Sequence, residues 1–152
     1  MNSSDNWLLH DHSRQEELLA KCQEAVDIED WGKANSTFRE LLAELNWHIF
    51  QEEQLVYPAY EAEVKAPGEP TLALRSEHRK IIAFMNDTRL VFESQDSEHV
   101  LECLNQLEQL LTKHHEKEED IFLPMASLIL KDNREAILKK LKTSDISKRE
   151  KK

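Results

Sequence analysis

Histidine and glutamate recur in this sequence at a spacing that places them on one face of a helix. His48 is followed four residues later by Glu52, and His114 is followed four residues later by Glu118. Residues four apart on a helix lie one turn apart on the same face. Two such pairs supply imidazole nitrogens and carboxylate oxygens, which bind divalent first-row metals. The pattern therefore indicates a metal site.

The two pairs belong to an internal repeat with an offset of 66 residues. Segment 48–58 matches segment 114–124, and the same offset carries dipeptide 11–12 onto dipeptide 77–78. Such self-similarity indicates a duplicated structural unit, here two helical hairpins. Each hairpin contributes one single histidine and one His-x-x-x-Glu pair. The expected metal ligands are His12, His48, Glu52, His78, His114 and Glu118.

The spacing of the histidines from the expected turns supports one shared layer. In each hairpin the two histidines are equidistant from the turn, which falls at residue 30 in the first and at residue 96 in the second. In antiparallel helices such residues lie at the same height. A single buried histidine is usually explained by pairing within the core, but a matched layer of four favours metal, because unpaired polar groups are costly to bury. The remaining histidines are expected to face solvent: His10, His99 and His115.

Four long segments have apolar residues at spacings of three and four, as amphipathic helices do. The expected helices are 4–27, 35–64, 71–93, 98–130 and a short one at 134–141. Turns are expected at Trp31-Gly32, Pro67–Pro70 and Ser94–Ser97. Pro58 is expected to kink the second helix or to mark its final turns.

These segments, together with only two glycines and four prolines, predict an all-α fold. The expected architecture is an up-down-up-down antiparallel four-helix bundle with a short C-terminal helix. The domain is expected to span residues 5–142, and residues 143–152 are expected to form a disordered charged tail.

The composition of the chain bears on its binding partners and on its cellular location. The net charge of −10 argues against nucleic acid as the main partner, although residues 131–152 hold nine Lys/Arg against four Asp/Glu. No apolar run approaches the ~20 residues of a membrane span, and the start of the chain lacks the features of an export signal. Cys22 and Cys103 cannot form a disulfide framework, so a cytoplasmic location is expected. Both lie too far along their helices from the histidines for a thiolate-bound cluster.

At these residues the chain resembles the hemerythrin-like (HHE cation-binding) family. The resemblance covers about residues 5–130. It rests on the ordered set Asp11-His12, His48-x-x-x-Glu52, Glu77-His78 and His114-x-x-x-Glu118, with endings at Pro58 and Pro124. It implies a centre of two iron ions with an oxo or hydroxo bridge that meets O₂, NO or peroxide, and other divalent metals can occupy such a site.

The resemblance has two departures from the oxygen-carrying hemerythrins. Those proteins have a second histidine one turn after the third-helix histidine, where this chain has Ile82. They also have an aspartate five residues after the last histidine, where this chain has Glu119, with Glu118 at four. The ligand set is closer to the four-His/two-Glu di-iron members, some of which are linked to repair of damaged iron–sulfur clusters.

Three functions remain open at this point. The leading one is a non-enzymatic di-iron protein that binds or senses a small oxidant, or handles iron. The alternative is a di-iron redox enzyme or an iron–sulfur-centre repair protein, and the third is a structural helical interaction module. The expected partner is a small diatomic or peroxide ligand, with no nucleic acid and no membrane, and the oligomeric state is open.

The ligand set also predicts how two ions are shared. His12 and His48 are expected to serve one ion, while His78 and His114 serve the other. The two glutamates are expected to bridge both ions, which would then be nearly equivalent.

Overall fold

The computed structural model describes residues 7–8, 12–65, 68 and 70–150, with side chains described through residue 144. Within these residues the protein is all-helical, as predicted, and contains no strand. The α-helices are α1 Ser13–Asp27, α2 Trp31–Gln51, α3 Tyr57–Val64, α4 Thr71–Phe92, α5 Ser97–Lys117, α6 Leu123–Ile129 and α7 Arg134–Glu150.

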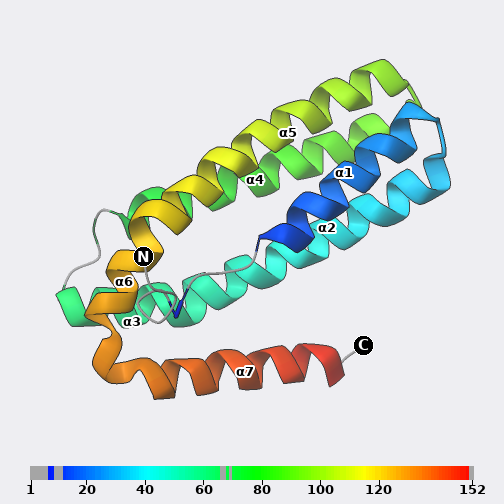
Figure 1. Cartoon of the computed structure of the whole chain (residues 1–152). Helices are drawn as coiled ribbons and strands as arrows, with labels where there is room; N and C mark the ends of the chain where they lie inside the picture. Colours follow the sequence, from blue (N-terminus) through cyan, green and yellow to red (C-terminus); the bar gives the residue numbers. More distant parts are fainter. Residues whose placement is uncertain (1–6, 9–11, 66–67, 69, 151–152) are drawn as a thin grey trace.

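Four long helices run lengthwise along one another (Figure 1). Helix α1 packs against α2 and α5, and α4 packs against α5 and α2. Consecutive helices are joined at alternate ends, an arrangement compatible with the expected up-down-up-down bundle. Helix α1 begins at Ser13, later than the predicted start at residue 4, and residues 1–6 and His10 lie outside the described residues.

The two hairpin turns are built in the same way, 66 residues apart. Glu29 and Gln95 have φ values of 58° and 52°. The next residue in each case is an aspartate that caps the following helix: Asp30 accepts from the backbone N–H of Lys33, and Asp96 accepts from that of His99. Trp31 therefore begins α2, and the prediction of a turn at Trp31-Gly32 was wrong by about two residues because the capping role of Asp30 was missed.

Two π-helical segments interrupt the long helices at equivalent places. They span Glu52–Val56 and Glu118–Phe122, and each is followed by an α-helix with proline in its first turn. Proline has no backbone N–H and its ring crowds the preceding turn, so the widened turn accommodates it. Pro58 thus marks the change from π to α geometry, and the chain remains helical to Val64. Both widened segments begin at a predicted glutamate ligand.

Apolar side chains form two clusters, one on each side of a polar layer. The larger cluster fills the space among α1, α2, α4 and α5 toward the hairpin turns, with Phe38, Leu41, Met85, Leu104 and Leu107 at its centre. The smaller one lies at the opposite end, where α3, α6 and α7 meet. Buried polar groups between them include five of the six predicted ligands.

Helix α7 follows α6 and contacts the widened segment Glu52–Val56 that precedes α3. Ile137 is buried in the smaller cluster and Leu141 packs against it. The helix continues to Glu150, well beyond the predicted 134–141. Residues 143–150 contain neither glycine nor proline, so a helix anchored by its first turns can propagate through them. The division of the chain at residue 142 stays a prediction. No described helix is both long and apolar enough to cross a membrane.

The layered core predicts where truncation is costly. Leu107 is fully buried, whereas Leu110 on the same helix is 36% exposed. Leu107→Ala is expected to lower the free energy of unfolding of the metal-free protein by about 2–5 kcal/mol. Leu110→Ala is expected to cost about 1 kcal/mol or less. Urea unfolding in the presence of a chelator measures both, and equal losses would contradict this assignment of the core.

Candidate metal centre

Four of the six predicted ligands converge between the apolar clusters. One ligand atom from each of Glu52, His78, His114 and Glu118 lies within 4.8 Å of the others, and all four side chains are buried. The Nε2 atoms of His78 and His114 are 3.1 Å apart. Two nitrogens about 2.1 Å from one ion and roughly 90° apart would themselves be separated by about 3 Å. The separation therefore fits two adjacent ligands of one ion.

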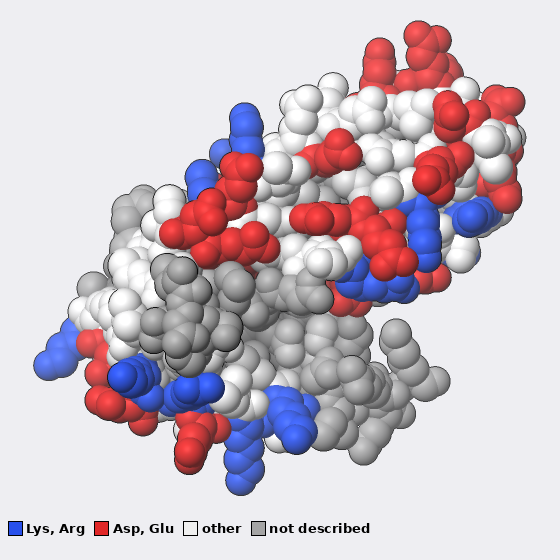
Figure 2. Space-filling model, viewed as in Figure 1, with Lys and Arg blue, Asp and Glu red and all other residues white. Residues whose placement is uncertain are grey.

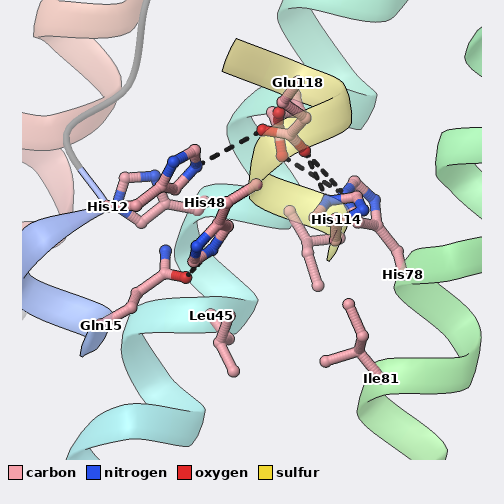
Figure 3. A pocket seen from close by; sticks show the side chains of 11 residues that line it. His12, Gln15, Leu45, His48, His78, Ile81, His114 and Glu118 are labelled. Carbon is pink, nitrogen blue, oxygen red and sulfur yellow. Dashed lines mark hydrogen bonds and ion pairs between the residues drawn. The ribbon is translucent and has the colours of Figure 1, made fainter. Parts of the chain in front are cut away.

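Glu118 lies between imidazoles on its two sides (Figure 3). Its Oε1 is 2.5 Å from His114 Nε2 and 3.5 Å from His78 Nε2, while its Oε2 is 3.4 Å from His12 Nε2. Each carboxylate oxygen thus faces a different part of the layer. This is the arrangement that a carboxylate bridging two metal ions requires.

His12 and His48 lie at the other side of Glu118 but are less closely converged. Their ring centroids are 6.4 Å apart, and both line the same pocket as the four converged side chains. His48 Nε2 lies 3.2 Å from an oxygen of Glu44, one turn earlier on α2. The structure therefore places all six predicted residues around one pocket, with the His12–His48 half more open.

Carboxylates hold the outward nitrogens of three of these histidines. His12 Nδ1 donates to Glu119 at 2.6 Å, and His78 Nδ1 donates to Glu53 at 2.7 Å. His114 Nδ1 donates to Glu77 at 2.8 Å. Such bonds fix the tautomer and the ring orientation, and they raise the basicity of the Nε2 that faces the ion.

Glu53 and Glu119 each follow a predicted ligand by one residue, which places them about 100° around the helix from Glu52 and Glu118. No role was predicted for them. This offset of one residue points each carboxylate at the outer nitrogen of a histidine on a neighbouring helix. The signal available in the sequence was the Glu-Glu doublet at both copies of the repeat.

Burial and mutual contacts shift the pKa values of the ionisable groups in this layer. Burial and the nearby carboxylate of Glu118 raise the pKa of Glu52 well above its usual value. Burial would also raise the pKa of Glu118, but hydrogen bonds from His114, His12 and His78 hold it well below its usual value. Burial lowers the pKa of His78, yet its bonds to Glu118 and Glu52 outweigh this and raise it to about 10. The raised pKa values of Glu52 and His78 mean that these two groups hold protons more tightly than usual, and metal binding would have to displace such protons.

His115 is a buried member of this layer, and the prediction that it faces solvent was wrong. Its side chain is 5% exposed. Its ring stacks on His12 with a centroid distance of 3.7 Å, and its Nε2 lies 2.9 Å from Oε1 of Gln15. Burial lowers the pKa of His115 to about 3. Helix α5 contacts α4 on one side and α1 on the other, so adjacent histidines are buried against different neighbours. His99, by contrast, is exposed as expected.

Aromatic and thiol groups complete the surroundings. Tyr57 is fully buried and its ring stacks on His78, with centroids 5.8 Å apart. Cys22 and Cys103 are free thiols. Cys22 is buried and donates to the backbone carbonyl of Ala34 in the larger apolar cluster, away from the pocket. Neither thiol belongs to the group of candidate ligands among the described residues.

An all-helical fold with a buried layer of histidine and glutamate is typical of metal-binding helical proteins. Comparison with known families assigns the chain more closely. The model of the hemerythrin HHE cation-binding domain matches residues 3–126. The chain belongs to this family, as its sequence indicated. The comparisons with curated proteins and with solved structures gave no match.

Glu53 and Glu119, which accept hydrogen bonds from histidine Nδ1 atoms, can be distinguished experimentally from the metal ligands. Glu53→Gln and Glu119→Gln should each weaken metal affinity by about 10–100-fold, because a neutral amide is a poorer acceptor for an imidazole N–H. Competition with a chelator measures the affinity.

Glu116→Gln is the matched control, since Glu116 is exposed on α5, the helix that carries His114. Its affinity should equal that of the unaltered protein. Unchanged affinity in both test variants would show that these carboxylates do not support the histidines.

Proposed function

We propose that this protein holds two iron ions in the layer between its apolar clusters and binds or senses a small oxidant such as O₂, NO or peroxide. The observation that carries the proposal is the position of Glu118, whose two oxygens face His12 on one side and the His78–His114 pair on the other. Membership of a cation-binding family supports a metal. Nitrogen and oxygen ligands suit iron, although manganese, zinc or cobalt can occupy the same set.

The ligands divide between two ions in this proposal. His78 and His114 serve one ion, and their Nε2 atoms already have the separation of adjacent ligands. His12 and His48 serve the other. Glu52 and Glu118 would hold both ions, and an oxo or hydroxo group would complete the centre.

The surrounding residues determine what else can reach the centre. When bound, the iron pair supplies redox chemistry toward a small oxidant. Leu45, Ile49 and Ile81 line the pocket beside the ligands and exclude bulk water. The free space is about 10 Å³, close to what one water molecule needs. Side chains must therefore move to admit a pair of ions together with a small oxidant.

Metal analysis of anaerobically prepared protein tests the ligand set. We expect about two iron ions per chain after iron-replete expression. Glu52→Ala and Glu118→Ala should each lower the metal content to about one ion or less, because each removes an oxygen from both ions. Asp120→Ala, at an exposed position beside the site, should keep two. Two ions retained in both glutamate variants would refute the bridging assignment.

The alternative function is a di-iron redox enzyme or an iron–sulfur-centre repair protein. Repeated turnover of the oxidant distinguishes an enzyme from a stoichiometric binder. Reduced protein is mixed with O₂, NO or peroxide in the presence of an external reductant. A binder or sensor consumes about one oxidant per centre, whereas an enzyme continues at a steady rate. Sustained consumption that is lost with Glu118→Ala would favour the enzyme.

The free thiols of Cys22 and Cys103 are compatible with the proposed cytoplasmic location.

A further inference from the structure

The repeat places equivalent residues along two seams that flank the metal layer, one between α1 and α5 and the other between α2 and α4. Four positions on the α1/α5 seam differ in chemistry from their counterparts 66 residues away. Gln15, Glu16, Glu108 and His115 on one seam correspond to Ile81, Ile82, Leu42 and Ile49 on the other. The α2/α4 seam is therefore aliphatic at these four positions, where the α1/α5 seam carries an amide, a carboxylate or an imidazole.

The polar seam contains a groove that leads toward the metal layer. The groove has a volume of about 330 Å³ and lies between α1 and α5. Exposed Glu16, Glu108 and Thr112 form its mouth, and buried Leu19, Leu111 and His115 form its floor. His115 lines both the groove and the pocket of the metal ligands.

The orientation of His115 suits a cation on the groove side. Its Nε2–H donates to Oε1 of Gln15 at 2.9 Å, which leaves the lone pair on Nδ1. That Nδ1 lies 3.9 Å from Oε1 of Glu16 at the mouth of the groove. An imidazole nitrogen and a carboxylate oxygen at this separation are ligands that a divalent first-row metal accepts. On its other face His115 stacks on His12, one of the proposed ligands.

We propose that the groove between α1 and α5 is the route by which divalent metal ions reach the centre, with Glu16 and Glu108 attracting the ion and His115 binding it in transit to His12. This inference rests on the proposed metal centre. Carboxylates at the mouth favour cations over anions, and many acidic side chains on the visible face lie over α1 and α5 (Figure 2). An uncharged oxidant would gain nothing from them. The aliphatic α2/α4 seam offers no such ligands at the equivalent positions.

The test measures the rate at which metal-free protein takes up Co²⁺, followed by its absorption in a stopped-flow instrument. The variant Glu16→Gln/Glu108→Gln should load about tenfold more slowly at low ionic strength, and the difference should shrink as salt screens the mouth. Its final metal content should equal that of the unaltered protein, because neither residue is a permanent ligand.

The matched control is Glu17→Gln/Glu102→Gln. It removes the same charge from the same two helices at exposed positions that do not line the groove. This control should load at the rate of the unaltered protein. Equal slowing in the two double variants would overturn the route, since net charge alone would then set the rate.

A third variant, His115→Ile, introduces the residue found at the equivalent position of the other seam. It should load more slowly yet reach the same final metal content. Loss of one ion would show that His115 is a permanent ligand and would overturn its role in transit. If the unaltered protein takes up no Co²⁺ and no Fe²⁺, the proposed metal centre itself fails. Normal content with unaffected rates in every variant would overturn the route alone.

Discussion

The burial of ionisable groups in one layer is the constraint on which the rest of this structure depends. Glu52 and Glu118 are 2% and 1% exposed, and an isolated buried carboxylate costs several kcal/mol or more. The layer tolerates them because imidazoles surround Glu118 and because carboxylates outside the layer anchor those imidazoles. Apolar clusters on both sides exclude water, which strengthens each of these contacts. Removing one partner would therefore leave others uncompensated.

Much of this arrangement is readable in the sequence because helical geometry leaves few choices. Long periodic segments with few turn residues predicted the all-α fold. The His-x-x-x-Glu spacing put imidazole and carboxylate on one face, and equal distances from the turns put them at one height. Glu52, His78, His114 and Glu118 converge as that geometry requires. The family assignment followed from the same ordered residues.

What the sequence did not predict depends on contacts between helices. His115 follows the ligand His114 by one residue and therefore points to a different side of α5. That side is buried as well, because α5 packs against both α4 and α1. A usable signal was Gln15, a polar residue three positions after His12 and so on the same face of α1, where it needs a partner. The π segments were missed because proline was expected to kink the helix, whereas a widened turn absorbs it and keeps the axis continuous to Val64.

The two unlike seams also bear on how such a protein can evolve. A helical hairpin that pairs with an identical copy must present the same residues along both seams, since two-fold symmetry copies every substitution. A substitution that creates a groove along one seam would therefore create the same groove along the other. Once two hairpins share a single chain, each seam can change independently. The two seams then differ in chemistry, with isoleucine at positions 49 and 81 and a polar pair at positions 115 and 15. No symmetric dimer could have this difference.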